Sequence, residues 1–241
     1  VILSTDSEAL SVGALRTPQI ADVWRSALWA SGTINLRVDL GGARDLRVIG
    51  LAAPRDGLLP SAGATVQVTA SAVQADDAEA LDTGALPLTL APHGLLVVTL
   101  PAVIPARWVR LQFAGVGDPY LQLGRLWIGD ALVTERNLAY GAPHQVTEHG
   151  ASGRAGISGV RYAARGARLR SIAMEINAIP DAGADALRQC ALDAGTEGQA
   201  LVSWAGTGLR NSMLGRFFAP PAVRQVHHGL WSAELSIEED A

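Results

Sequence analysis

The sequence predicts a mainly β protein, with an N-terminal β-sandwich followed by a C-terminal β domain that carries one helix. Period-two alternation is the strongest sign, because polar and apolar residues interleave over 107–113 and again over 120–128. Short apolar runs separated by prolines continue this rhythm from residue 33 onward. Apolar residues at helical spacing stand out only over 182–194. We therefore expect strands almost everywhere else.

The N-terminal unit, residues 1–141, holds enough candidate strands for a sandwich. Prolines separate several of them, and proline belongs at strand ends and edges because it removes a donor from the hydrogen-bond ladder. The acidic segment 76–82 is expected to be a solvated loop, with a calcium loop as the less favoured alternative. The candidate strands are 33–41, 45–51, 65–70, 86–90, 95–100, 107–113 and 120–128.

A Gly-rich connector, residues 142–158, is the expected boundary, and residues 159–241 form the second unit. In that unit Asp181 is a candidate helix cap, and Gly195 is placed to end the helix. Gly229 lies where a tight hairpin needs a positive φ. The candidate strands are 160–162, 168–179, 200–205, 214–218, 222–227 and 230–237.

Composition narrows the classes of function. The chain is 49% hydrophobic and 17% charged, which is typical of a folded protein with many interfaces. Its net charge is −4, and all 19 basic residues are scattered arginines, which argues against nucleic-acid recognition. No run approaches the roughly 18 apolar residues that span a membrane. The first residues lack the features of a signal peptide, so we expect folding in a cytoplasm.

Catalytic and metal-binding motifs are missing from the sequence. It contains no nucleophile elbow, zinc-protease helix motif or phosphate-binding loop. Cys190 is the single cysteine, which leaves no intrachain disulfide and no cysteine-based metal site. The histidines lack metal-ligand spacing; they are His93, His144, His149, His227 and His228. We expect no catalytic residues, no metal and no cofactor.

Tryptophans are the best candidates for ligand contact. Trp24 and Trp29 flank a predicted loop, so they are the candidate residues for stacking on a glycan. Trp108 and Trp127 lie on alternating strands, which favours a place in the core or in a protein interface.

Short sequence motifs in the N-terminal unit resemble those of a known family. Trp24-Arg25-Ser26 precedes a strand ending Asp39-Leu40-Gly41, and the strand 45–51 follows. Further on stand the segments ARWVRL and YLQLGRLWIG. Over roughly residues 20–141 the chain resembles the galactose-binding-like jelly roll found in tail-tip proteins of long-tailed bacteriophages. The resemblance implies that the predicted sandwich is a jelly roll.

The C-terminal unit resembles distal-tail and tail-tube proteins of the same phages over roughly residues 158–240. The similarity consists of element order, a long strand, one helix and then hairpins, and of the ending W-x-x-x-L-x-I-E-E. It implies a structural protein of the virion tail, assembled in the bacterial host cytoplasm. The implied partners are the tail tube, the hub and other tail-tip proteins.

Self-association follows from the same resemblance, which implies a ring of six copies, with three as the alternative. The segment 214–237 carries more apolar residues than a small domain needs inside. We therefore take Phe217, Phe218 and Trp231 as the candidate subunit interface. The alternative function is a carbohydrate-binding module that recognises a host-surface glycan, and a tail protein can combine both roles.

Overall fold

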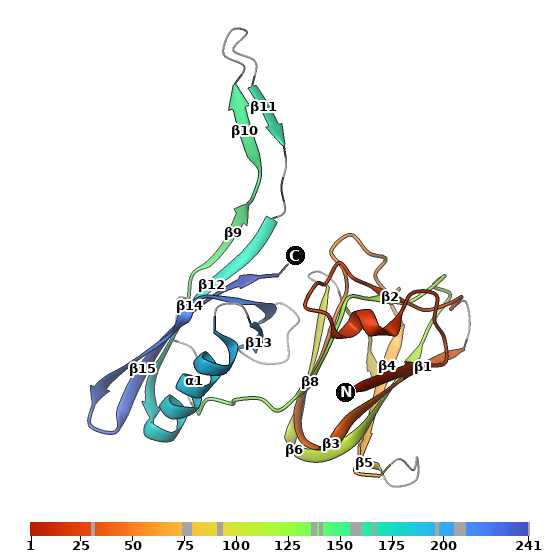
Figure 1. Cartoon of the computed structure of the whole chain (residues 1–241), viewed down its shortest axis with the longest axis horizontal. Helices are drawn as coiled ribbons and strands as arrows, with labels where there is room; N and C mark the ends of the chain where they lie inside the picture. The colour runs from red at the N-terminus through yellow and green to blue at the C-terminus, as the bar shows by residue number, and fades with distance from the viewer. Residues whose placement is uncertain are drawn as a thin grey trace. The chain divides into compact units, whose positions relative to one another are not determined.

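The protein folds into two compact β-rich units, which confirms the mainly β prediction. The computed structural model describes residues 1–29, 32–73, 79–90, 94–135, 139, 142–154, 161–164, 166, 168–195, 198–204 and 211–240. The first unit is built mainly from Val1–Ala131, and the second from Leu132–Ala205 and Met213–Ala241. Figure 1 gives the element labels used below.

The first unit contains one large antiparallel sheet in the strand order β1-β3-β6-β4-β5, with β8 paired to the other end of β3. A short pair, β2 with β7, and a single 3-10 turn, η1 (Val12–Arg16), complete the described part. The strands are β1 (Ile2–Thr5), β2 (Trp24–Arg25), β3 (Thr33–Ala52), β4 (Thr65–Ser71), β5 (Glu79–Pro87), β6 (Leu95–Ala114), β7 (Gln122–Leu123) and β8 (Arg125–Gly129).

Strands β3 and β6 are long, and each contributes to both layers of the sandwich. The first half of β3 pairs with the second half of β6, and Leu36 lies opposite Leu111. The second half of β3 pairs with the first half of β6 and with β8. The register shifts between Asp39 and Arg44, where the ladder bends. The sequence prediction of separate strands here was wrong, because Gly41 and the β6 prolines mark the bend rather than strand ends.

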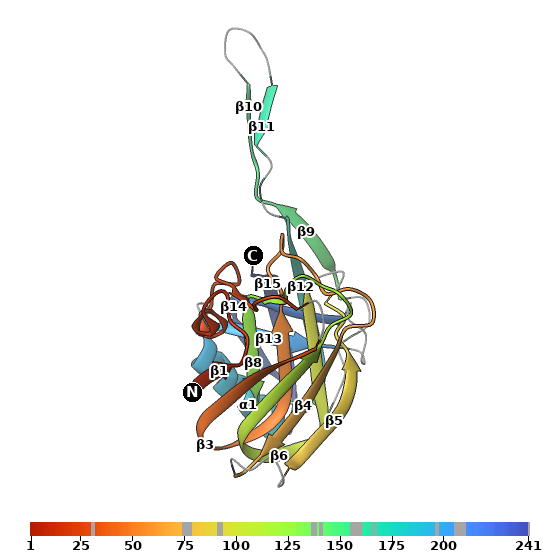
Figure 2. The ribbon, with the colours of Figure 1, turned by 90° about the vertical axis from the view of Figure 1, so that its right-hand side faces the viewer.

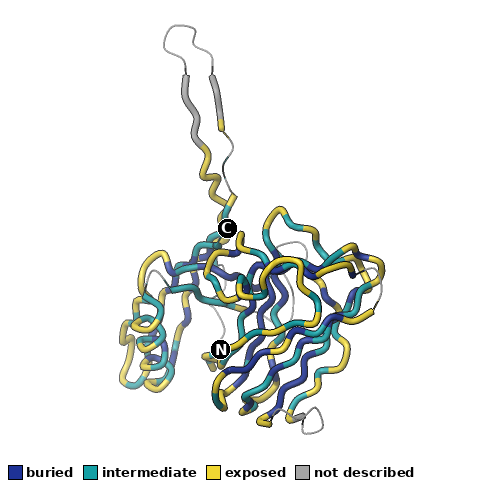
Figure 3. Tube along the Cα trace, turned by 45° about the vertical axis from the view of Figure 1, so that its right-hand side comes forward, coloured by how far each residue is buried: buried dark blue, intermediate teal, exposed yellow. Residues whose placement is uncertain are grey.

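The core of the first unit lies between these layers. Alternate residues are buried along 33–38 of β3 and 109–113 of β6, and Figure 3 colours the buried residues dark blue along the chain. Phe113 packs 6.3 Å from the ring of Trp24, measured between ring centroids. The largest fully buried side chains are Trp24, Trp29, Phe113, Leu15, Leu36, Leu46, Ile49, Leu51, Leu90, Leu111, Leu121 and Leu123.

The second unit contains a five-stranded antiparallel sheet in the order β13-β14-β15-β12-β9, together with the two-stranded hairpin β10-β11 (Figure 1). Helix α1 (Asp181–Ala194) lies on one face of this sheet. The strands are β9 (His144–Glu148), β10 (Ala151–Arg154), β11 (Arg161–Ala164), β12 (Arg168–Pro180), β13 (Gln199–Ser203), β14 (Ser212–His227) and β15 (Leu230–Glu239).

Helix α1 begins and ends close to the predicted limits. Its N-cap is Pro180, so Asp181 is the first helical residue rather than the cap. Gly195 ends the helix with φ +56°, and Gly229 turns the β14-β15 hairpin with φ +71°, both as predicted. Inward-facing residues of the sheet meet the helix through Leu187. The buried cluster consists of Ile172, Met174, Ile176, Ile179, Leu187, Met213, Phe217, Ala233, Leu235 and Ile237.

Two sequence expectations about the second unit need correction. The predicted connector 142–158 contains strand β9, which pairs with β12, and strand β10. The predicted strands 214–218 and 222–227 are one strand, β14, whose register shifts around Pro220. Proline interrupts the ladder locally without ending the strand, because the pairing resumes beyond the shift. No helix among the described residues has the length and apolar character needed to cross a membrane.

Candidate functional site

The outer surface of the β1-β3-β6-β4-β5 layer carries the richest set of ligand-type side chains in the described part of the first unit. Because side chains alternate along a strand, residues that flank the buried ones point outward. Register brings these outward residues into rows across neighbouring strands. Figure 2 shows the ribbons of these strands side by side. We call this surface the polar face and define it by Asn35, Arg37, Gln67, Trp108, Arg110 and Gln112.

Amide side chains form one row of the polar face, since Asn35 lies opposite Gln112 and Gln112 opposite Gln67. The Asn35 Nδ2 donates to Asp6 Oδ2 at 2.7 Å, and Gln112 Nε2 donates to Asn35 Oδ1 at 3.3 Å. At the other end Gln67 Nε2 donates to Asp82 Oδ1 at 2.7 Å. The row is therefore anchored by a carboxylate at each end.

Acceptor groups remain open in the middle of this row. Gln112 and Gln67 each use a side-chain N–H in the bonds above, and within the described residues their Oε1 atoms accept no hydrogen bond. A carbonyl oxygen has two lone pairs and each amide nitrogen a second N–H. The two glutamines thus offer acceptors and donors to a ligand from adjacent strands.

Arginines form the next row, where Arg37 lies directly opposite Arg110. The Arg37 side chain is exposed and makes no ion pair or hydrogen bond within the described part of the chain. Beyond Arg110 the row continues through buried Thr69 to Asp82. The hydrogen bond from Gln67, the backbone N–H of Gly84 and the charge of Arg110 together lower the pKa of Asp82.

Trp108 forms the third row, between Asp39 and Ser71. It is half-buried, and the guanidinium carbon of Arg107 lies 4.9 Å from its ring centroid. Arg107 holds Asp39 in a two-point ion pair, with Nε 2.8 Å from Oδ1 and Nη2 3.0 Å from Oδ2. These bonds, with the backbone N–H of Gly41, lower the pKa of Asp39 to about 2, and the same pair raises the pKa of Arg107.

The structure contradicts the stacking role predicted for Trp24 and Trp29. Their exposed fractions are 0% and 1%, so neither ring has a face open to a sugar. Trp24 lies in β2, which pairs with β7, and the Trp29 backbone N–H donates to Pro119 O at 3.0 Å. Because these bonds draw the predicted loop back over the sandwich, its tryptophans fill the core.

Trp108 and Trp127, the tryptophans predicted on alternating strands, are in contrast only half-buried. Trp108 and Trp127 both stand at outward positions, since their strand neighbours Val109, Leu126 and Ile128 face the core. The prediction that these two tryptophans lie in the core was therefore wrong. Their place in a protein interface, the other option, stays a prediction. Each ring has an arginine beside it, with the Arg125 guanidinium 5.7 Å from the Trp127 centroid.

The candidate interface residues of the second unit separate into different environments. Phe217 is buried in the core of that unit, whereas its neighbour Phe218 is 76% exposed. Trp231 donates from Nε1 to Asp181 Oδ1 at 2.6 Å and lies 4.2 Å from the guanidinium of Arg188. Phe217 has a structural role in the core, and Phe218 offers free apolar surface.

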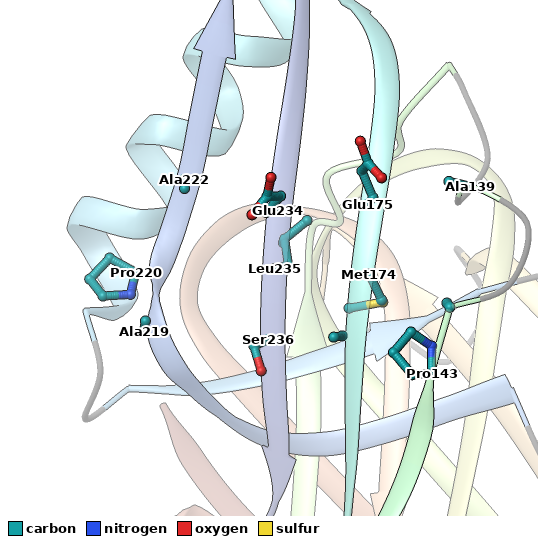
Figure 4. A pocket seen from close by; sticks show the side chains of 12 residues that line it. Ala139, Pro143, Met174, Glu175, Ala219, Pro220, Ala222, Glu234, Leu235 and Ser236 are labelled. Atoms are coloured by element: carbon teal, nitrogen blue, oxygen red, sulfur yellow. The ribbon is translucent and has the colours of Figure 1, made fainter.

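A shallow groove of about 410 Å³ lies on the outer face of the second sheet, on the side away from α1 (Figure 4). Small side chains dominate it, and Glu175 and Glu234 are cross-strand partners in its wall. It is lined by Ala139, Ala142, Pro143, Ala173, Met174, Glu175, Ala219, Pro220, Ala222, Glu234, Leu235 and Ser236. The groove has few groups that fix the orientation of a ligand, and it lacks a cation to balance its carboxylates.

Metal-type residues do not gather in the described ranges, where no group of His, Cys, Asp and Glu is arranged to hold an ion. His149 Nε2 lies 2.9 Å from Glu238 Oε1, and the ring of His144 lies 5.6 Å from that of Trp204. His93 and residues 76–78 of the acidic segment lie outside the described residues, whereas residues 79–82 belong to β5. Burial and nearby Asp193 raise the pKa of the Cys190 thiol, which favours the inert protonated form.

Comparison with known proteins gives structural matches only. No family model matches the chain, and no curated protein matches it. A family 32 carbohydrate-binding module of NanJ from C. perfringens, solved with galactose, is 17% identical, with a TM-score of 0.44 over 53% of this chain and 91% of that one. The lectin domain of lectinolysin, solved with Lewis B antigen, is 16% identical, with a TM-score of 0.41 over 54% and 93%.

A third solved structure is a module named CBM32-3 from a family 31 glycoside hydrolase of Clostridium perfringens. It is 19% identical, with a TM-score of 0.44 over 54% of this chain and 91% of that chain. The ligands named in these descriptions belong to those proteins.

Sequence reasoning missed the polar face although its signal is present. Arg37, Arg110 and Gln112 occupy the polar positions of alternating strands, and such positions face solvent. The alternation does not reveal which strands are neighbours, however, so the amide and arginine rows emerge only with the register.

Proposed function

We propose that the first unit binds a carbohydrate through the polar face. The observation that carries this proposal is the juxtaposition of open amide groups, arginine donors and a half-exposed tryptophan on one layer. Orienting polar groups beside an aromatic surface are typical of small-ligand sites in general. Of the two functions considered from the sequence, this arrangement favours glycan recognition.

Sugar hydroxyls need both donors and acceptors, because each hydroxyl donates one hydrogen bond and accepts others. Gln67 and Gln112 offer acceptors through their Oε1 atoms, and Arg37 offers donors from the neighbouring row. Trp108 supplies apolar surface for the C–H groups of a sugar ring. Alternate residues on a strand lie about 6.8 Å apart, so successive rows are spaced to contact successive parts of an extended ligand.

The test is glycan binding by the full chain and by matched tryptophan variants. Trp108→Ala removes the aromatic surface of the polar face and is expected to weaken binding at least about tenfold, a loss of about 1.4 kcal/mol. Trp127→Ala is the control, because this tryptophan is also half-buried, outward-facing and beside an arginine, but lies on the other layer. A glycan array followed by titration calorimetry measures both, with circular dichroism as the check of folding. Equal affinity of the two variants for the same sugar would refute the proposal.

A structural role in a phage tail remains the second candidate, supported by one observation in the second unit. Phe218 is 76% exposed on β14, and a large exposed aromatic residue is typical of a protein interface. If this unit assembles with copies of itself, Phe218→Ser should reduce the sedimentation coefficient of the assembled species. A monomer at all concentrations for the unaltered chain, with Phe218 accessible to solvent, would remove the support. Ring order, tail tube, hub and virion location remain predictions from the sequence resemblance.

A further inference from the structure

We propose that the polar face selects a carboxylated sugar, whose carboxylate is held between Arg37 and Arg110. This inference rests on the proposed function and names the class of ligand. It begins from two guanidinium groups placed directly opposite each other on neighbouring strands of one sheet face. The Cβ atoms of such cross-strand partners are about 4.5–5.5 Å apart, which lets both side chains reach one ligand group.

The arginine pair places two like charges directly opposite each other on one sheet face. Like charges directly opposite on a sheet destabilise it, whereas opposite charges stabilise it. Neutral Thr69 follows Arg110 in the row, and Ser4 of β1 flanks Arg37 on the other side. Packing does not require Arg37, because its side chain is exposed. A bound anion would relieve the repulsion.

Three described carboxylates near the polar face, those of Asp6, Asp39 and Asp82, already accept hydrogen bonds from other groups. Asp6 accepts from both the backbone and the side-chain nitrogen of Asn35, at 2.9 and 2.7 Å. Asp39 pairs with Arg107, and Asp82 accepts from Gln67 and from the Gly84 backbone N–H. Asp82 also lies within electrostatic reach of Arg110. Of the two arginines in the row, Arg37 is therefore the main group offered to a ligand, and Arg110, which has contacts of its own, adds positive charge beside it.

A carboxylate fits this arrangement better than a neutral hydroxyl. The guanidinium group presents a planar fork of N–H donors that matches the two oxygens of a carboxylate, and these charge-assisted bonds are stronger than neutral ones. The neighbouring Gln112 and Gln67 then remain for the ring hydroxyls. Acidic sugars such as uronic acids and sialic acid combine both kinds of group.

The experiment compares sugars that differ only in charge. Oligogalacturonate is titrated against its methyl ester, which keeps the ring and removes the charge, and sialyllactose is titrated against lactose. We expect the acidic member of at least one pair to bind at least about tenfold more tightly, with an affinity that falls as salt is raised. Arg37→Gln should remove this preference, while Arg55→Gln, an exposed loop arginine away from the sheet, should retain it.

A stability measurement separates recognition from loss of structure. Arg37→Gln is expected to melt at the same temperature as the unaltered protein or slightly higher, because it removes a like-charge contact. Equal binding of charged and neutral partners by the unaltered chain would overturn the carboxylate assignment and leave glycan binding standing. Failure of every sugar on the array would overturn both. Retention of the preference in Arg37→Gln would overturn the assignment to this residue.

Discussion

The buried tryptophan segment around Trp24 and Trp29 and the polar face around Trp108 show opposite relations between sequence context and exposure. Trp24 and Trp29 flank a predicted loop, yet both are fully buried. Trp108 stands in a strand pattern that favours burial or an interface, yet it lies on the outer face among arginines and amides. Whether a tryptophan is available to a ligand is decided by how segments fold over one another, because local pattern alone reports only periodicity.

Truncating the buried tryptophan is expected to have the largest effect. Trp29→Ala removes a fully buried ring and should lower the free energy of unfolding of the first unit by about 3–5 kcal/mol. Trp108→Ala should cost less than about 2 kcal/mol, because a half-exposed site leaves no closed cavity. Urea denaturation monitored by far-UV circular dichroism compares the two variants. Similar losses of unfolding free energy in the two variants would contradict the difference in burial between Trp29 and Trp108.

Filling the space beside Trp29 is expected to have an intermediate effect. A Cβ added at Gly115 would lie 2.6 Å from Trp29 Cε2, so Gly115→Ala should force a shift and destabilise the unit by about 1–3 kcal/mol. Gly129→Ala is the matched control, since a Cβ there meets no atom within 4 Å. The same denaturation experiment applies. An unchanged midpoint for Gly115→Ala would mean that the ring of Trp29 is not held against this strand.

Removing the ion pair between Arg107 and Asp39 is expected to have the smallest effect on stability. This ion pair lies beside Trp108 of the polar face. In the intact protein the pKa of Asp39 is lowered from 3.8 to about 2, chiefly by Arg107. A lowered carboxyl pKa stabilises the folded state above pH 3.8, and this contribution is lost as the pH falls from there through about 2. Arg107→Gln should raise the Asp39 pKa toward 3.8, as measured by NMR titration of the carboxyl carbon. A value that stays near 2 would show that the Gly41 N–H, rather than Arg107, dominates.

The sequence was sufficient for the class of fold and for several local features. The alternation of Val109, Leu111 and Phe113 correctly marked the inward side of β6, and Gly195 and Gly229 marked a helix end and a hairpin. These features depend on neighbouring residues only. The lengths of the strands could not be predicted in the same way. Gly41 resembles a strand end in the sequence, but it lies at a bend within β3.

The candidate site could not be assembled from the sequence for a different reason. The arginine pair joins Arg37 with Arg110, and the amide row joins Asn35, Gln112 and Gln67, which are far apart along the chain. Register between β3, β6 and β4 is a property of the whole sandwich, and a shift by one residue would turn each of these side chains to the other face. The exposure of Trp24 and Trp29 was predicted wrongly, because their burial depends on hydrogen bonds of the Trp24–Trp29 segment to β7 and to Pro119.

Strands β3 and β6 continue through the bend, and this continuity affects how the first unit unfolds. Each strand belongs to both layers, so its backbone hydrogen bonds connect the layer carrying the polar face to the layer containing β8. Because the same two strands run through both layers, we expect the layers to open together. Opening of the sandwich is therefore concerted, and amide protons in the two layers should exchange with solvent through a common global event. Amide protons under the polar face should therefore exchange as slowly as those in the most protected part of the unit.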